Sequence, residues 1–350
     1  MAVRMKDIAK ELGLSVVTVS KVLRNHPDIS EETRKRVLKR MKELDYQPNL
    51  AARSLITGQS WSIGLVVPDL LHPFFAQVAK AISAEIRNRS YCLLISSSDE
   101  DPQVEEQEIR QLVARRVDVL LIASARSSPA SFKFLEGQQV PYILLDRQID
   151  GLKANFFGVN DVEVGLIATR HLIEQGCRRV AHIRGPEVST ARGRLEGYRQ
   201  ALAEFKGRTL PEQVVSLGSS GDHRGEKGGY TATMELLHSK TRPDAIFCFN
   251  DPSALGALRA IEEAGLRIPD DIAVVGCGNL PYGDLLRVPL TSVDQGSENI
   301  GKLAATLALR LAASKSRPAP KSHLIPPRIV VRASSLRKKP KNFSKNSIVE

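Results

Sequence analysis

The segment Leu14-Ser15-Val16-Val17-Thr18-Val19-Ser20-Lys21-Val22-Leu23 decides how the N-terminal part of this chain folds. Its later apolar residues recur at the spacing of one helical face, and Ser15 stands where a helix N-cap is expected. Residues 6–12 before it carry a second helical pattern, which Gly13 ends. The sequence therefore predicts two short helices joined by a tight turn.

A third helix is expected directly after this pair. Ser30, followed by two glutamates, is placed to cap it, and Val37, Met41 and Leu44 form its apolar stripe. Two helices across a tight glycine-containing turn form the helix-turn-helix unit, whose second helix lies in the DNA major groove. The alternative interpretation is a three-helix bundle that serves only as a structural cap.

The outward face of the second predicted helix favours DNA over the structural cap. It carries Val16, Val17 and Lys21, and a thymine methyl group or the acceptors of guanine can meet such side chains in the major groove. Thr18 and Ser20 are suited to phosphate contacts. We therefore interpret residues 1–46 as a DNA-binding head.

The positive charge of the chain is concentrated at its two ends. The net charge is +11 over 350 residues; residues 1–60 hold 12 Lys or Arg against 7 Asp or Glu, and residues 331–350 hold 6 against 1. A basic segment on a nearly neutral body is typical of a protein whose partner is a nucleic acid. We expect residues 335–350 to be a disordered basic tail.

Residues 47–60 form a linker that contains a short helical pattern. Pro48 opens it, good helix formers follow, and Gly58 lies at its end. Two helical turns are not stable alone in water, so this hinge should order only when it is docked. A DNA minor groove would serve, with Arg53 drawn to its negative potential and Leu55 wedged between base steps.

Three blocks of this sequence closely resemble the head and hinge of the lactose and purine repressor (LacI-type) family. They are Lys6-Asp7-Ile8-Ala9, the segment 14–23, and Tyr46-Gln47-Pro48-Asn49 with Ala52-Arg53-Ser54-Leu55. In that family the head reads one half of the operator, and the leucine that matches Leu55 intercalates at the operator centre. The pattern and the resemblance together predict DNA contacts from Ser15, Val16, Val17, Thr18, Ser20, Lys21, Asn49, Ala52, Arg53 and Leu55.

From residue 62 onward, short β-branched runs alternate with longer amphipathic segments, which predicts parallel sheets covered by helices. Strands are expected at Ile63–Val67, Tyr91–Ile95, Val117–Ile122, Tyr142–Leu145, Val180–Ile183, Ala245–Phe249 and Ile272–Val275. Helices are expected at Phe75–Arg87, Glu105–Ala114, Val162–Gln175, Arg194–Glu204, Tyr230–Leu237 and Ser253–Ala264. About 270 residues are too many for one open sheet, so we expect two lobes.

This region resembles the effector domain of the same family, which is similar to periplasmic sugar-binding proteins. The resemblance implies two lobes, three crossings between them and a ligand in the cleft. By residue matching, the effector contacts would be Arg194, Asn250, Asp146, Phe157 and Gln295. Where the family usually has a ligand-binding aspartate, this chain has Gly278; either Asn279 substitutes for it, or the ligand differs from a simple hexose.

The predicted fold class is a small all-α helix-turn-helix head joined to a two-lobed α/β domain of the periplasmic-binding-protein type, with two parallel sheets and helices on both faces. The predicted domains are the head at 1–46, the hinge at 47–60, the effector-binding and dimerisation domain at 61–334, and the tail at 335–350. Lobe 1 is expected at about 61–160 and 291–321, and lobe 2 at about 161–290 and 322–334.

Two other classes of protein compete with this interpretation. The sequence has no phosphate-binding glycine loop, no zinc-protease motif and no serine-nucleophile elbow, so we predict no enzyme and no cofactor or metal. A secreted solute-binding protein would need a signal peptide, and residues 1–7 lack an apolar core. The four cysteines form no C-x-x-C pair, and we interpret them as reduced core residues.

The sequence thus predicts a transcriptional regulator that acts as a repressor. We expect it to stay in the cytoplasm, associated with the nucleoid, and to have no membrane partner. Its expected partners are an operator in double-stranded DNA, a small sugar-like or nucleobase-like effector, and a second copy of itself. Pairing of dimers into tetramers, the identity of the effector and the choice between induction and corepression stay open.

Overall fold

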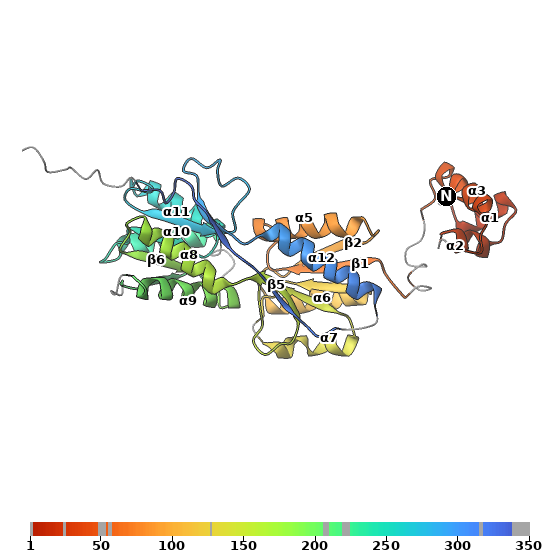
Figure 1. The fold of residues 1–350 in the computed structure, drawn as a ribbon, viewed down its shortest axis with the longest axis horizontal. Helices are drawn as coiled ribbons and strands as arrows, with labels where there is room; N and C mark the ends of the chain where they lie inside the picture. Colours follow the sequence, from red (N-terminus) through yellow and green to blue (C-terminus); the bar gives the residue numbers. More distant parts are fainter. Residues whose placement is uncertain are drawn as a thin grey trace, which may run out of the picture. The chain divides into compact units, whose positions relative to one another are not determined.

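The computed structural model describes residues 3–23, 26–47, 54, 58–126, 128–205, 210–218, 225–314 and 318–337. The chain folds as two units, Met1–Ser60 and Trp61–Glu350 (Figure 1). Within the described residues, no helix is long and apolar enough to cross a membrane.

The first unit contains three helices in its described part: α1 (Met5–Leu12), α2 (Val16–Leu23) and α3 (Glu31–Glu43). Gly13 ends α1 in the left-handed conformation at φ +66°, and the side chain of Ser30 caps α3 by accepting from the N–H of Thr33. A small shared core holds the three helices together, and its fully buried members are Ile8, Val19 and Val37. The predicted helix-turn-helix arrangement is therefore present.

The second unit begins with an all-parallel sheet that forms lobe 1. Its strands follow the order β11-β5-β4-β3-β1-β2. Their bounds are β1 (Ser62–Val67), β2 (Cys92–Ser97), β3 (Val119–Ile122), β4 (Tyr142–Leu145), β5 (Asn155–Val159) and β11 (Ser322–Ile325). Helices α5 (Pro73–Arg87) and α12 (Ser297–Ala313) cover one face. The other face is covered by α6 (Pro102–Ala114), the 3₁₀ turn η1 (Pro129–Phe132) and α7 (Lys133–Gln138).

Lobe 2 has a sheet of the same architecture, in the order β12-β10-β9-β8-β6-β7, with only β12 antiparallel to its neighbour. Its strands are β6 (Val180–Arg184), β7 (Gln213–Ser216), β8 (Ala245–Cys248), β9 (Ala273–Cys277), β10 (Thr291–Asp294) and β12 (Arg328–Val330). Helices α8 (Asp161–Glu174) and α9 (Ser189–Ala203) cover one face. Helices α10 (Gly225–His238) and α11 (Asp251–Glu263) cover the other.

The sheet pairing moves two of the lobe boundaries expected from the sequence. Residues 291–294 pair with β9 in lobe 2, although they were expected in lobe 1. Residues 322–325 pair with β5 in lobe 1, although they were expected in lobe 2. The chain therefore crosses between the lobes after β5, after β10 and after β11, because strand pairing, and not the position along the sequence, decides which sheet each segment joins.

Two smaller expectations are also corrected. Cys92 is exposed rather than part of the core, because it begins the edge strand β2. The expected tail boundary at 335 lies too early, since Ser335 is fully buried and Arg337 donates to the carbonyl oxygens of Pro269 and Asp244 at 3.0 and 3.1 Å. Residues 338–350 lie outside the described residues.

Candidate DNA-binding head and effector cleft

Helix α2 presents two valines on its outer face. Val16 is 46% exposed and Val17 is 62% exposed, whereas Val19 and Val22 on the opposite face are buried. A monomeric head gains nothing by exposing such side chains at the start of a helix, so this face is available for a partner. The exposure agrees with the orientation expected from the apolar spacing.

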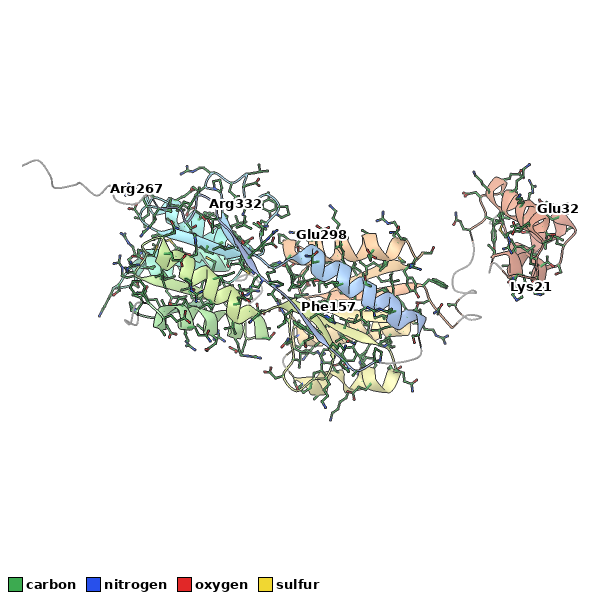
Figure 2. All side chains as sticks on the ribbon, viewed as in Figure 1. Lys21, Glu32, Phe157, Arg267, Glu298 and Arg332 are labelled. Carbon is green, nitrogen blue, oxygen red and sulfur yellow. The ribbon has the colours of Figure 1, made fainter. Side chains whose placement is uncertain are left out.

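The polar residues predicted to contact DNA are already engaged with the head itself. The hydroxyl of Ser15 accepts from the N–H of Thr18 at 3.0 Å and lies 2.9 Å from the Thr18 hydroxyl, so both residues hold the start of α2. Lys21, on the last turn of α2 (Figure 2), donates to Asp28 at 2.5 Å. This bond is the main reason that the pKa of the Asp28 carboxyl is lowered. Lys21 must exchange Asp28 for a base or a phosphate if it is to contact DNA.

The hinge contacts predicted from the sequence lie outside the described residues. They are Asn49, Ala52, Arg53 and Leu55. Their role stays a prediction.

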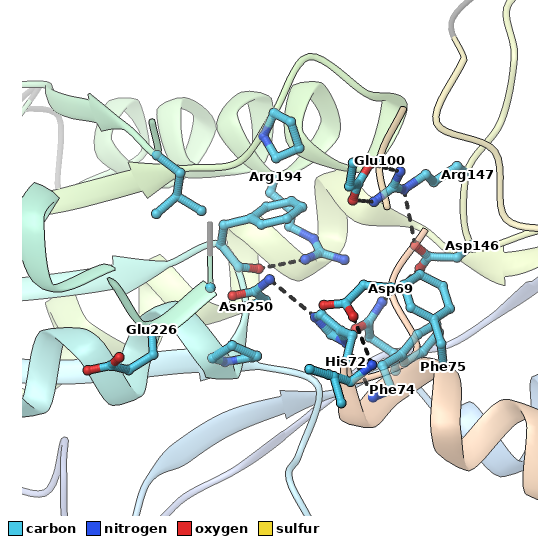
Figure 3. Close-up of a pocket in the computed structure, with 17 residues that line it drawn as sticks. Asp69, His72, Phe74, Phe75, Glu100, Asp146, Arg147, Arg194, Glu226 and Asn250 are labelled. Carbon is cyan, nitrogen blue, oxygen red and sulfur yellow. Dashed lines mark hydrogen bonds and ion pairs between the residues drawn. The ribbon is translucent and has the colours of Figure 1, made fainter. Parts of the chain in front are cut away.

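A cavity of about 370 Å³ lies between the two lobes of the second unit (Figure 3). Four of the predicted effector contacts, Arg194, Asn250, Asp146 and Gln295, line it. Its remaining lining residues are Asp69, Leu71, His72, Phe74, Phe75, Glu100, Arg147, Pro186, Leu217, Gly225, Glu226, Phe249 and Pro252. Loops at the carboxyl ends of the parallel strands supply most of these residues, which is where ligands of open α/β sheets bind.

Arg194 is the central cation on the lobe 2 side. It is 3% exposed; its Nε donates to Asp161 Oδ1 at 3.0 Å and its Nη1 donates to the carbonyl oxygen of Phe249 at 2.6 Å. Burial raises the pKa of Asp161 to about 6, against the opposing effect of the Arg194 charge. We expected a helix-start position for Arg194, but α9 begins at Ser189, so Arg194 lies in its second turn and is fixed from two sides.

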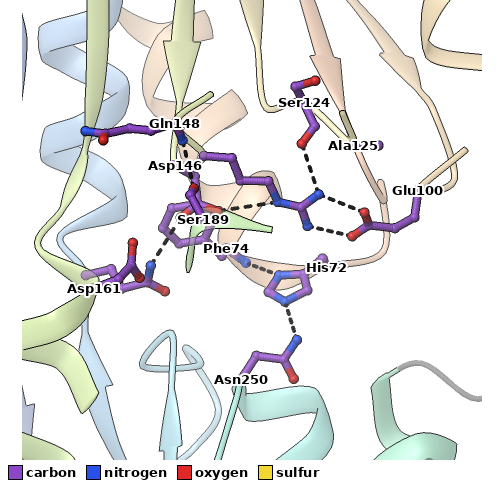
Figure 4. A network of polar contacts seen from close by, with 12 residues as sticks. His72, Phe74, Glu100, Ser124, Ala125, Asp146, Gln148, Asp161, Ser189 and Asn250 are labelled. Atoms are coloured by element: carbon purple, nitrogen blue, oxygen red, sulfur yellow. Dashed lines mark hydrogen bonds and ion pairs between the residues drawn. The ribbon is translucent and has the colours of Figure 1, made fainter. Parts of the chain in front are cut away.

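On the lobe 1 side, Asp146 and Arg147 follow β4. Gln295 donates from Nε2 to Asp146 Oδ1 at 3.3 Å, and burial raises the pKa of the Asp146 carboxyl. The guanidinium of Arg147 forks onto Glu100 with contacts of 2.7 and 2.6 Å and also donates to the carbonyl oxygen of Ser124 (Figure 4). A forked guanidinium-carboxylate pair of this kind is rigid, so Asp146 is held in place beside it.

Two helix caps face each other across the cavity. Asn250 caps α11 and His72 caps α5, and Asn250 Nδ2 lies 3.2 Å from His72 Nε2 (Figure 4). Burial lowers the pKa of His72 to about 4, so this imidazole is neutral at physiological pH. The sequence interpretation missed His72, although its place directly before Pro73 is the signal of an N-cap.

Two predicted effector contacts lie away from the cavity. Phe157 (Figure 2) is buried in the lobe 1 core and stacks on His323 with ring centroids 4.7 Å apart. Asn279 Oδ1 accepts from Arg332 at 2.8 Å, and its N–H donates to the Ser292 hydroxyl, so Asn279 is used inside lobe 2. The structure therefore does not bring Asn279 to the cavity as a replacement at the Gly278 position.

The comparisons with known proteins agree with this architecture. Residues 4–49 match the model of bacterial regulatory proteins of the lacI family, and residues 169–335 match that of a periplasmic binding protein-like domain. The ribose operon repressor of Halalkalibacterium halodurans is 32% identical over 332 residues, which cover 95% of this chain and 96% of that protein. The chain belongs to the LacI family.

Two further LacI-type proteins extend the comparison. The transcriptional repressor PurR of Proteus mirabilis is 34% identical over 333 residues, covering 94% of this chain and 96% of that protein. The crystal structure of the lac repressor dimer bound to operator and the anti-inducer ONPF is similar with a TM-score of 0.83 and 27% identity, covering 96% of this chain and all of that chain. The predicted fold class is confirmed, and so is the prediction that this LacI-family chain is no enzyme. Among the described residues, no group of His, Cys, Asp or Glu could hold a metal ion.

Proposed function

We propose that this chain is a sequence-specific DNA-binding repressor that binds a palindromic operator as a dimer and responds to a small molecule in the cleft between its lobes. The observation that carries the proposal is the outward face of α2, where Val16 and Val17 stand exposed on the second helix of a helix-turn-helix. Such side chains suit thymine methyl groups in a major groove. Membership of the LacI family supports both the DNA partner and repression.

A dimer with two heads would read two half-sites related by the two-fold axis of the protein, spaced by a whole number of helical turns. The hinge residues Asn49, Ala52, Arg53 and Leu55 would then enter the minor groove at the operator centre, with Leu55 as the wedge. The similar lac repressor structure, a dimer on its operator, supports this arrangement.

The effector, sugar-like or nucleobase-like, would bind in the cleft to Arg194, Asn250, Asp146 and Gln295. Because these residues come from both lobes and from the segment that connects them, a bound molecule changes the free energy of lobe closure. The free energy by which the ligand shifts operator binding is limited to the difference between its binding free energies for the open and the closed lobes.

The experiment that tests this function is a selection of random DNA duplexes on the full-length protein at one fixed physiological salt concentration. We expect a palindrome with a flexible pyrimidine-purine step at its centre. Recovery of no motif, both with and without a panel of sugars and nucleobases, would contradict sequence-specific binding.

A matched pair of variants identifies the reading face. Val17→Ala should weaken binding to the selected duplex about tenfold, because a methyl contact in each half-site is lost, and should leave binding to a scrambled duplex unchanged. Leu38→Ala removes an exposed side chain from α3 of the same head and serves as the control. Equal effects of the two substitutions on operator affinity would count against α2 as the reading helix.

A further inference from the structure

Both guanidinium groups at the cavity are already paired with a carboxylate. Arg147 is bound in a fork to Glu100, and Arg194 is paired with Asp161 at 3.0 Å. Asp146 is a further carboxylate, and its nearest cation is the Nε of Arg147 at 4.0 Å. Carboxylates therefore outnumber guanidinium groups among the described residues that form this site. A phosphate or carboxylate ligand would meet repulsion there instead of a free counter-ion.

Helix N-termini often bind anions, and α5 and α11 both begin at the cavity. One N–H group at the start of each helix is already taken, however. The N–H of Phe74 donates to His72 Nδ1 at 3.3 Å, and the N–H of Ser253 donates to Asn250 Oδ1 at 2.9 Å. These side-chain caps occupy one N–H donor at each helix start and so reduce the number that a phosphate would find.

The same two caps leave hydrogen-bond donors and acceptors mismatched between the lobes. A neutral imidazole has a single acceptor nitrogen, and Nδ1 of His72 uses it to accept from the N–H of Phe74. The tautomer that keeps this α5 cap places the proton on Nε2, which faces the NH₂ group of Asn250, whose oxygen is held by Ser253. In that tautomer two donors face each other at 3.2 Å. An oxygen atom that accepts from both would satisfy the cap and the interlobe contact together.

The rest of the cavity wall offers both an acceptor and a donor to a ligand. Asp146 has one carboxylate oxygen bound by Gln295, and its other oxygen makes no hydrogen bond within the described part of the chain. Arg194 uses Nε and Nη1, which leaves Nη2 without a partner among the described residues (Figure 3). A hydroxyl group both donates and accepts, so adjacent hydroxyls fit a wall that offers a carboxylate oxygen and a guanidinium nitrogen.

The aromatic rings at the cavity are poorly placed to hold a planar base. The guanidinium of Arg194 lies over the ring of Phe249 at 4.7 Å, and the backbone of Gly185 also packs against that ring. Phe74 and Phe75 meet edge to face, with centroids 5.1 Å apart, and both are buried. A base could stack only by displacing one of these contacts.

We propose that the cleft selects an uncharged polyhydroxylated molecule of about monosaccharide size, and that it rejects phosphorylated or acidic sugars and free nucleobases. The cavity volume of about 370 Å³ is near the lower end of the range for small-molecule sites. This inference rests on the proposed function only in taking the cleft as the effector site.

The test is a thermal-shift screen of the full-length protein followed by calorimetric titration of each hit. The probes are D-ribose, D-xylose, D-glucose, D-galactose and myo-inositol, with ribose 5-phosphate, glucose 6-phosphate, gluconate, hypoxanthine and adenine as their charged or planar counterparts. We expect at least one neutral polyol to bind, and its phosphate or acid counterpart to bind at least 100-fold more weakly. Tighter binding of a phosphate, an acid or a base would overturn the proposal, and so would a panel in which no neutral polyol binds.

A charge-neutralising variant tests the reason for this selectivity. Asp146→Asn should weaken binding of the neutral hit about tenfold, because a charge-assisted hydrogen bond is lost. It should also lower the ratio between the dissociation constants of the phosphate counterpart and the neutral hit. Asp284→Asn makes the same charge change on an exposed loop of lobe 2 and should alter neither value by more than about twofold. An unchanged preference in a folded Asp146→Asn protein would contradict the role given to this carboxylate.

These measurements need no DNA, so the two proposals can fail separately. A protein that binds a neutral sugar but selects no operator would leave the ligand class standing and remove the repressor function. A protein that selects an operator and releases it in response to a charged ligand would leave the repressor function standing and remove the proposed ligand class.

Discussion

His182 in β6 is a buried histidine that the cleft does not use. Its ring stacks on Phe247 with centroids 4.7 Å apart, and its Nδ1 lies 3.0 Å from the carbonyl oxygen of Phe247. Its Nε2 is buried and has no hydrogen-bond partner in the described part of the chain. Burial lowers the pKa of His182 to about 4, so the folded protein keeps this ring neutral.

Replacing this histidine should change the response of the fold to acid. The unfolded chain takes up a proton near the ordinary histidine pKa of 6.5, whereas folded His182 does so only near 4. The stability that neutral His182 contributes is therefore present above pH 6.5 and is lost as the pH falls. Between pH 7 and pH 5 the wild type should lose about 2 kcal/mol more than His182→Phe, measured by urea unfolding at both pH values.

The comparison with the variant is needed because two aspartates act in the opposite direction. Burial raises the pKa values of Asp161 and Asp251 to about 6, so their ionisation lowers stability as the pH rises from about 4 to 6. These contributions are shared by both proteins and cancel in the difference. Parallel pH profiles for wild type and His182→Phe would contradict a neutral, buried His182.

At the scale of elements, glycines let helices pack closely in lobe 2. A Cβ on Gly197 of α9 would lie 1.9 Å from the carbonyl oxygen of Val162 in α8, and one on Gly165 of α8 would lie 2.0 Å from that of Arg194. Both obstacles are backbone atoms, which cannot move aside as a side chain could. The position of α9, which carries Arg194, therefore depends on the absence of side chains at this α8–α9 contact.

Gly197→Ala should force α8 and α9 apart and destabilise the protein by about 3 kcal/mol, measured by urea unfolding. It should also weaken ligand binding, because Arg194 lies one turn away on α9. Gly137→Ala is the matched control, since a Cβ at this helical position of α7 would contact nothing within 4 Å. The control should be neutral or more stable by about 0.5 kcal/mol, because alanine favours helix more than glycine does. An unchanged free energy of unfolding in Gly197→Ala would argue against this close packing of α8 on α9.

The elements that the sequence predicted well are those with an uninterrupted local pattern. Tyr142–Leu145 is an apolar run bounded by turns, and it was predicted with its observed bounds. The strands that were not predicted are short or partly polar, such as Ser322-His323-Leu324-Ile325 in β11. Pairing with β5, 163 or more residues earlier in the chain, makes this segment a strand, and no local pattern carries that information.

The candidate site divides in the same way. Arg194, Asn250, Asp146 and Gln295 could be predicted because each matches a family motif. The cap role of His72 had a local signal in Pro73, but the contacts of His72 with Asn250 and of Glu100 with Arg147 could not be predicted, because their partners lie 178 and 47 positions away. Asn279 does not line the cavity, and its bond to Arg332 could not be predicted, because it forms only when the C-terminal segment is folded onto lobe 2.

At the scale of the whole molecule, the lobes of the second unit are joined by three crossings and by contacts that involve side chains of both lobes. Besides the His72 and Asn250 pair, the N–H of Gln148 donates to the Ser189 hydroxyl at 2.9 Å, and Arg192 pairs with Asp150 at 2.8 Å. These contacts connect the loop after β4 with the start of α9. The two lobes thus already contact each other, and a ligand bound between them changes the stability of this existing interface.

If the cleft and the head are thermodynamically coupled, each must influence the other by the same factor. A ligand that changes the operator dissociation constant of this repressor tenfold must have its own dissociation constant changed tenfold by the operator. We expect a factor between about 5 and 150, corresponding to about 1–3 kcal/mol of coupling. The measurement is a titration of the neutral hit into the full-length protein with and without the selected duplex, set against titration of the duplex with and without the hit. A scrambled duplex at the same salt concentration is the control and should leave the ligand affinity unchanged, because it engages the head without the specific hinge contacts. A factor of one in both titrations, or an equal effect of the scrambled duplex, would mean that ligand binding in the cleft does not control operator recognition, whereas equal factors in the two directions verify that both titrations are at equilibrium.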